Sequence, residues 1–129
     1  MEEPGENDRS STEFLPPDEF ERVADEFFKD PAQSVRDWET AAHAQRRIVD
    51  AVSNIVVRTA GARSIAIVSH GAVGTLLYCH LRGVPISREY DQPANGGGNF
   101  FSFPLPRGMP NHPWRPIDVP AASQDVFGE

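Results

Sequence analysis

One tetrapeptide has residue types and a setting that suit phosphate binding: Val68-Ser69-His70-Gly71, between an apolar run and a helical pattern. Ligands of α/β sheets bind beyond the carboxyl ends of strands, where the next helix offers N–H groups to an anion. Gly71 lets the backbone approach closely, so that His70 projects over the turn. The alternative is a histidine that ends a strand and hydrogen-bonds locally. The tetrapeptide alone favours this alternative, because short motifs often occur by chance.

The other reactive side chains have simpler interpretations. Cys79 and His80 are adjacent in a helical pattern, so they point about 100° apart and do not favour a shared metal ion. We expect Cys79 to be a small buried side chain and His43 to be a solvated helix residue. Gly96-Gly97-Gly98 precedes a strand pattern and lacks a following Lys-Ser or Lys-Thr, so it predicts a flexible loop rather than a nucleotide-binding motif.

Composition and charge exclude several classes of protein. The 129 residues carry a formal net charge of −7, which disfavours nucleic acid and anionic membranes as partners. No apolar run approaches the roughly 20 residues that cross a bilayer, and the first eight residues are acidic, unlike a signal peptide. Cys79 is the single cysteine, so an intramolecular disulfide is excluded. These features predict a cytoplasmic protein.

Two helices are expected ahead of the tetrapeptide. Residues 18–29 place apolar side chains at helical spacing, with acids in the first turn and a lysine in the last. Ser34 and Asp37 resemble a capping arrangement before a long amphipathic pattern, from residue 35 to about residue 59. Within that pattern, Trp38 is expected to anchor the core.

Strand patterns flank a third helix. Residues 64–69 form an apolar run rich in β-branched residues, typical of a strand buried on both faces. Residues 72–81 return to helical spacing, and residues 99–105 alternate as a second strand that Pro104 ends or confines to an edge. This alternation predicts an α/β fold. Two strands are too few for such a sheet, even with a short addition around residues 114–119, so part of the sheet is expected to be missing.

The region around the tetrapeptide is similar to a known family. Residues 65–77, Ile-Ala-Ile-Val-Ser-His-Gly-Ala-Val-Gly-Thr-Leu-Leu, resemble the second histidine motif of the histidine phosphatase superfamily, which is phosphoglycerate mutase-like. Further segments resemble that family in the same order, namely 5–10, 14–21, 85–93, 96–101 and 114–118. Several segments in order are more specific than one tetrapeptide. The resemblance implies a partial three-layer α/β sandwich over residues 1–119, followed by a flexible tail, 120–129.

The resemblance also implies a mechanism. In this family a first histidine, in an Arg-His-Gly motif, attacks phosphorus and becomes a phosphohistidine, while a second histidine and arginines hold the phosphoryl oxygens. A carboxylic acid protonates the leaving oxygen. His70 matches the second histidine and Glu6 the acid, and Gly71 and Asn99 would lie near the phosphate. Without the resemblance, Glu6 is better interpreted as a surface acid, and Arg9 as an ordinary surface arginine rather than a guide for anions.

The ligand implied is a small phosphorylated substrate or inorganic phosphate, with neither metal nor organic cofactor. The sequence departs from the family pattern because Arg-His-Gly is absent from it, and His43, His80 and His112 do not end an N-terminal strand. We therefore expect the C-terminal portion of a phosphatase or mutase, inactive by itself and poorly stable, with residues 65–69 left as an exposed apolar edge.

The alternative is a non-catalytic phosphate-binding or dimerising module, which as a homodimer would cover that edge. The substrate, the choice between phosphatase and mutase, and the oligomeric state stay open.

Overall fold

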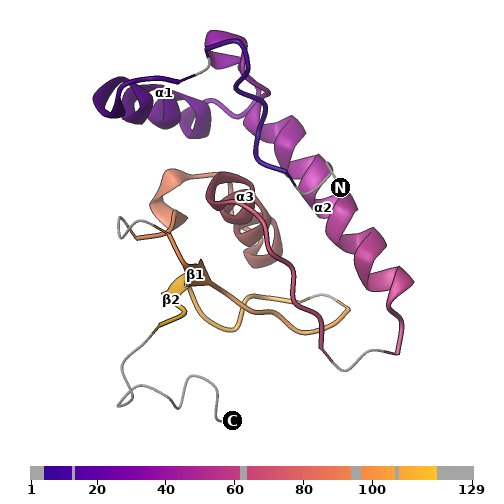
Figure 1. Cartoon of the computed structure of the whole chain (residues 1–129). Coiled ribbons are helices and arrows are strands. Elements are labelled where there is room, and N and C mark those ends of the chain that lie inside the picture. Colours follow the sequence, from indigo (N-terminus) through magenta and orange to yellow (C-terminus); the bar gives the residue numbers. More distant parts are fainter. Residues whose placement is uncertain (1–4, 13, 62–63, 94–96, 107, 119–129) are drawn as a thin grey trace.

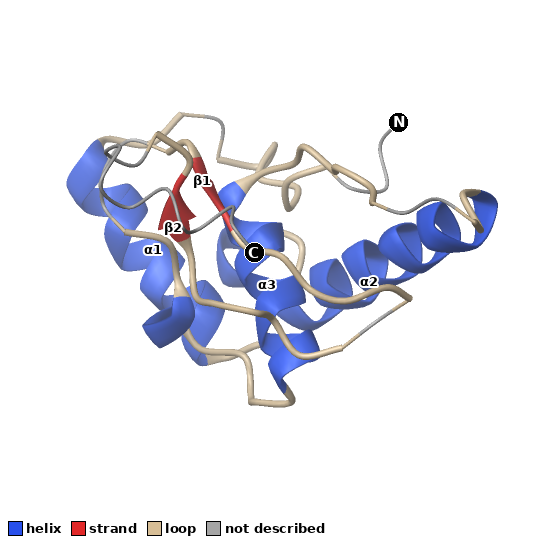
Figure 2. Ribbon diagram, turned by 90° about the horizontal axis from the view of Figure 1, so that it is seen from below, coloured by secondary structure: helices blue, strands red, loops and turns tan. Residues whose placement is uncertain are grey.

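The fold is mostly helical. The computed structural model describes residues 5–12, 14–61, 64–93, 97–106 and 108–118. Its elements in chain order are α1 (Pro17–Lys29), η1 (Val35–Asp37), α2 (Ala41–Arg58), α3 (Gly71–Arg82), η2 (Arg88–Tyr90), β1 (Asn99–Phe100) and β2 (Arg115–Pro116). Figures 1 and 2 place α3 centrally, with α1 and α2 on two sides of it. In the described ranges, no helix has the length and apolar character needed to span a membrane.

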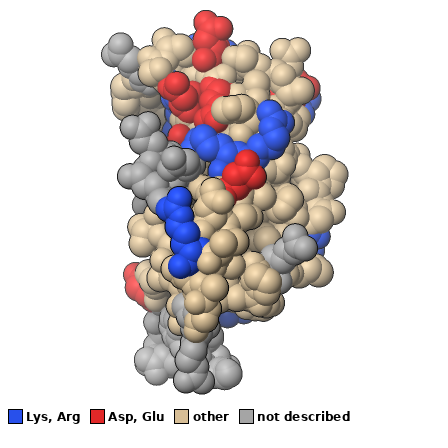
Figure 3. All heavy atoms as spheres, turned by 90° about the vertical axis from the view of Figure 1, so that its right-hand side faces the viewer, with Lys and Arg blue, Asp and Glu red and all other residues tan. Residues whose placement is uncertain are grey.

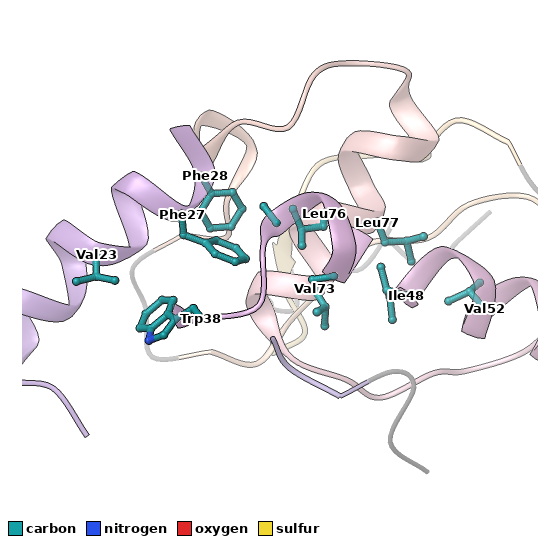
Figure 4. Close-up of a cluster of buried hydrophobic side chains, with 11 residues drawn as sticks. Val23, Phe27, Phe28, Trp38, Ile48, Val52, Val73, Leu76 and Leu77 are labelled. Carbon is teal, nitrogen blue, oxygen red and sulfur yellow. The ribbon is translucent and has the colours of Figure 1, made fainter. Parts of the chain in front are cut away.

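The core lies where the three helices meet. Phe27 of α1, Ile48 of α2, and Val73 and Leu76 of α3 are each at most 2% exposed, and Figure 4 shows them converging. Trp38 is also 2% exposed, and its ring lies 6.1 Å from that of Phe27, centroid to centroid. Burying one such side chain contributes about 1.5–3 kcal/mol. The prediction that Trp38 anchors the core is therefore confirmed.

Two of the expected helices occur where the apolar spacing predicts them. α1 begins with Pro17, which suits a first helical position because its missing N–H would have no intrahelical partner there. α3 ends at Gly83, which adopts a left-handed conformation with φ of 76°. The Gly83 N–H donates to the carbonyl oxygen of Cys79 at 3.0 Å, as glycine commonly does beyond a helix end.

The predicted start of α2 is wrong. Arg36 and Asp37 adopt left-handed φ values of 51° and 62°, which interrupt the helical pattern before Trp38. The hydroxyl of Ser34 donates to the Trp38 carbonyl at 2.8 Å instead of capping a helix. The cap is Thr40, whose side chain accepts a backbone hydrogen bond at 3.1 Å. Left-handed residues cannot continue a right-handed helix, so α2 begins only after this turn.

The strand predicted at residues 64–69 does not form. In Figure 1 this segment is a loop leading into α3, and no strand of the described chain pairs with it. Val68 is 94% exposed and Ile67 is 37% exposed. The apolar run is thus exposed, as expected of an edge without its neighbour. A strand needs hydrogen bonds to a second strand, and among the described residues no strand pairs with 64–69.

The small sheet is also shorter than predicted. β1 pairs antiparallel with β2, in a register that places Asn99 opposite Pro116 and Phe100 opposite Arg115. The strand predicted from 99 to 105 therefore ends at Phe100, while the short strand expected near the C-terminus is present as β2. A sheet with helices on both faces is not found in the described ranges, and the predicted tail 120–129 lies outside them.

Trp114 packs the C-terminal segment onto α3 rather than onto a larger sheet. Its indole N–H donates to the hydroxyl of Thr75 at 3.2 Å, and that hydroxyl donates to a carboxylate oxygen of Asp91 at 3.1 Å. The indole also meets the ring of Phe101 edge-on, with 4.9 Å between centroids. Thr75 is fully buried, so these hydrogen bonds satisfy a polar group that burial would otherwise penalise.

Two valines of α2 give a matched test of the core. Val52 is 6% exposed and Val57 is 73% exposed. We expect Val52→Ala to lower the free energy of unfolding by about 2 kcal/mol, because it removes buried methyl groups and leaves a cavity. Val57→Ala should change it by less than about 0.5 kcal/mol. Urea unfolding measures both, and equal losses in the two variants would contradict this core.

Candidate functional site

The candidate site is built around the N-terminus of α3. His70 precedes the helix in an extended conformation, with φ of −120° and ψ of 161°, and its carbonyl accepts the Gly74 N–H at 2.9 Å. Its imidazole makes no capping hydrogen bond and the residue is exposed. The ring can therefore meet a ligand from solvent. The first N–H groups of the helix lie beside it and need an acceptor from elsewhere.

That acceptor is the carboxylate of Glu6, from a distant part of the sequence. One oxygen, Oε2, accepts the N–H of Ala72 at 3.1 Å, and Oε1 accepts the N–H of Val73 at 3.0 Å. Oε1 also accepts the backbone N–H of Asn7 at 3.2 Å. A negative group is stabilised here by both the hydrogen bonds and the positive end of the helix dipole. The structure thus brings two sequence-predicted residues, Glu6 and Gly71, to the same helix end.

Arg9 lies next to this carboxylate. Its Nη2 is 3.6 Å from Glu6 Oε2, and its Nε donates to the Asn7 side-chain oxygen at 3.1 Å. The guanidinium stacks over the rings of Phe20 and Trp38, at 4.9 and 5.2 Å from their centroids. Burial lowers the pKa of Arg9, and Glu6 opposes this shift. Arg9 therefore presents a fixed positive charge to whichever anion occupies this helix end.

An ion pair holds the chain segment that carries Glu6. Arg47 of α2 donates to the carbonyl oxygens of Gly5 and Glu6, at 2.9 and 3.2 Å. The same guanidinium pairs with Glu39, at 2.9 Å between Nη2 and Oε1. Glu39 also accepts the backbone N–H of Asp8 at 3.1 Å. Figure 3 shows acidic and basic side chains adjoining on the side of the molecule where α2 lies.

The pKa of Glu39 follows from this environment. Burial raises it, but hydrogen bonds from Arg47, from His43 and from the backbone of Asp8 outweigh that effect, so the net pKa is lowered. The ordinary value is 4.5. Because the folded-state pKa lies below the unfolded one, Glu39 contributes stability above pH 4.5 and loses it as the pH falls through the folded value.

Gln92 covers the other side of the turn. A Cβ on Gly71 would lie 2.2 Å from Nε2 of Gln92, so a side chain at position 71 would require the Gln92 side chain to move. The oxygen of the Gln92 amide accepts a hydrogen bond from Asn99 at 2.8 Å. Asn99 is therefore linked to the helix end through Gln92, and no direct hydrogen bond between Asn99 and His70 or Glu6 is described.

The other histidines and Cys79 lie in different settings. His43 is exposed and pairs with Glu39 at 2.6 Å, and His80 is exposed in the last turn of α3. His112 packs on Phe100 with 4.9 Å between ring centroids. Cys79 is fully buried, as predicted, and burial raises the pKa of its thiol. The described residues contain no group of three or more potential metal ligands.

Sequence patterns did not reveal two residues of this site. Arg47 lies on the polar face of a helical pattern. Its hydrogen bond to Gly5 joins residues far apart in the sequence, and local patterns do not predict such a contact. Gln92 lies in a segment that resembles the family, but its amide had no distinguishing pattern. Arg88 is not part of this site. It forms ion pairs with Glu21 and Asp25 of α1, at 2.5 and 2.6 Å, and so joins η2 to α1.

Comparison with known proteins gives one match. The sequence model of the histidine phosphatase superfamily (branch 1) matches residues 10–97, which is more than half of the chain. The matched range includes His70, Gly71 and Gln92, whereas Glu6 and Asn99 lie just outside it. A search of curated proteins found no match.

The Glu6 cap can be tested by its effect on α3. We expect Glu6→Gln to lower the free energy of unfolding by about 1 kcal/mol, since the amide keeps an acceptor but loses the charge that the helix end favours. The amide resonances of Ala72 and Val73 should shift in NMR spectra. The matched control is Glu26→Gln, at an exposed position of α1, which should leave both observables unchanged. A Glu6→Gln variant with an unchanged free energy of unfolding and unchanged amide resonances would contradict the cap.

The Glu39 pair predicts a specific dependence on pH. We expect unfolding measured between about pH 3 and pH 7 to show stability falling with acid, because Glu39 becomes protonated and releases Arg47. Glu39→Gln should be less stable at neutral pH and should flatten the part of this decline that lies below pH 4.5. Glu26→Gln again serves as the control. An unchanged acid profile in Glu39→Gln would show that this ion pair has no part in the decline.

Proposed function

Because the chain belongs to the histidine phosphatase superfamily (branch 1), we propose that it binds inorganic phosphate or a small phosphorylated substrate at the N-terminus of α3. The observation that carries this proposal is the carboxylate of Glu6, which is held by the N–H groups of Ala72 and Val73 at 3.1 and 3.0 Å, beside exposed His70. A phosphoryl oxygen is negatively charged, as the carboxylate is, and would accept hydrogen bonds from the same N–H groups. In the complete domain, this phosphate binding would serve a phosphatase- or mutase-like reaction.

Each residue of the site has a proposed role. His70 donates from its imidazole to a phosphoryl oxygen, and Arg9, whose Nη2 lies 3.6 Å from the Glu6 carboxylate, supplies positive charge. Glu6 is the acid that protonates the leaving oxygen, which avoids expelling an alkoxide. Gly71 adds no side chain to the turn, and Asn99 orients the Gln92 amide that covers it.

The nucleophile of the proposed reaction has to come from outside these residues. The family's Arg-His-Gly motif does not occur in the 129 residues, and none of the described hydrogen bonds links His43, His80 or His112 to His70. We propose that this chain corresponds to the C-terminal part of a three-layer α/β sandwich, which binds phosphate but does not turn over substrate. Its extended apolar segment, 65–69, would pair with a strand of the complete sheet.

The same segment supports the alternative function. With Val68 at 94% exposure, two copies could pair their apolar segments and form a dimerising module that binds phosphate without catalysis. A stable, monodisperse dimer in solution would favour this alternative. A monomer that aggregates slowly would favour the partial domain.

Phosphate binding is tested with two histidines, His70 before the first turn of α3 and His80 in its last turn. We expect NMR titration with inorganic phosphate to shift the amides of Gly71, Ala72 and Val73, and we expect His70→Ala to weaken the affinity by about tenfold or more through the loss of a charged hydrogen bond. His80→Ala removes another exposed histidine, at the far end of the same helix, and should leave the affinity unchanged. Equal affinities in the two variants would remove His70 from the site.

Turnover is a separate prediction. We expect the sequence-verified 129-residue protein to hydrolyse an aryl phosphomonoester no faster than buffer, because the nucleophile of the family is absent from it. The measurement is release of the phenol over time, with His70→Ala as the background. Hydrolysis that exceeds this background and depends on His70 would overturn the assignment of an inactive chain.

A further inference from the structure

We infer that Glu6 is an internal competitor of phosphate, so that phosphate binding requires its carboxylate to leave the end of α3. This inference rests on the proposed function, because it concerns the same helix end. Both oxygens of Glu6 already accept the N–H groups of Ala72 and Val73, at 3.1 and 3.0 Å. A phosphoryl oxygen that took the same donors would place two anions in contact, and like charges at this separation repel each other. The two anions therefore exclude one another.

The hydrogen-bond roles lead to the same conclusion. Oε1 of Glu6 accepts a further hydrogen bond from the Asn7 backbone at 3.2 Å, so the side chain acts entirely as an acceptor in this position. A general acid must instead donate a proton to the leaving oxygen. Glu6 performs the role proposed for it only after it has left these donors. The same movement of the Glu6 side chain would therefore free the N–H groups of α3 and place the acid near the leaving oxygen.

The surrounding contacts show which part can move. The backbone of the segment is fixed, because Arg47 binds the carbonyl oxygens of Gly5 and Glu6 at 2.9 and 3.2 Å. The Glu6 side chain is held by the hydrogen bonds at the end of α3, by the Asn7 N–H at 3.2 Å and by Arg9 at 3.6 Å. Arg9 itself stays stacked on Phe20. Rotation of the Glu6 side chain therefore frees the site while Arg9 remains beside it.

The residue next to Glu6 has one buried hydrogen-bond donor that is not satisfied. The Nδ2 atom of Asn7 is buried and finds no hydrogen-bond acceptor, although Asn7 is only 4% exposed. Its other side-chain atom, Oδ1, accepts from Arg9. Leaving a buried N–H without a partner costs about 1–3 kcal/mol. With Glu6 at the end of α3, the adjacent Asn7 therefore keeps an unsatisfied donor.

The experiment compares phosphate affinities of the full 129-residue chain by NMR titration of the Ala72 and Val73 amides. We expect Glu6→Gln, which removes the competing charge, to bind inorganic phosphate about tenfold more tightly than the unaltered protein. Glu26→Gln, on the exposed face of α1, should bind as the unaltered protein does. An unchanged or weaker affinity in Glu6→Gln would overturn the competition while leaving the proposed site intact. Absence of binding by every protein would instead reject the proposed function, and this inference with it.

A second measurement needs no variant and so does not depend on the stability of Glu6→Gln. The carboxyl carbon of Glu6 is followed by NMR in the unaltered protein during the same titration. We expect its resonance to shift along the saturation curve of the Ala72 and Val73 amides, because one event displaces the carboxylate and fills the site. Amides that shift while the Glu6 carboxyl carbon does not would overturn the inference.

Discussion

The hydrogen bonds between the Glu6 carboxylate and the first N–H groups of α3 are the contact on which the rest of the arrangement depends. They join residues 66 and 67 positions apart in sequence, and they bring the N-terminal segment to the turn that carries His70. Arg47 and Glu39 then fix the backbone of that segment against α2. Without the cap, the helix end would lack acceptors and the N-terminal segment would lose its contact with α3.

Much of the helical structure could be predicted because apolar spacing within one helix is a local property. α1, α3 and the burial of Trp38 all follow from patterns of this kind. The start of α2 could not be predicted. It depends on left-handed backbone at Arg36 and Asp37, which apolar spacing does not signal because most non-glycine residues avoid it.

The strand prediction failed for a different physical reason. The β-branched run at 64–69 has the composition of a buried strand, but hydrogen bonding and burial come from neighbouring strands, which lie elsewhere in a sequence. No neighbour pairs with this run in the described chain, so it remains a loop with Val68 exposed.

At the site, the resemblance identified His70 and Glu6, and the structure brings their segments together. Arg47 and Gln92 carry no local signal and emerged from the fold alone.

Two glycines on α3 have a consequence for how that helix forms. Gly71 and Gly74 lie one turn apart, and the bare backbone is covered by Gln92 and by the indole of Trp114, which would lie 2.8 Å from a Cβ at position 74. A glycine inside a helix costs roughly 1 kcal/mol relative to alanine. A peptide of only 12 residues with this composition would be largely unfolded in water. The helix that follows His70 therefore depends on tertiary contacts for its stability. It will be less ordered when the segment that carries Trp114 is not packed against it.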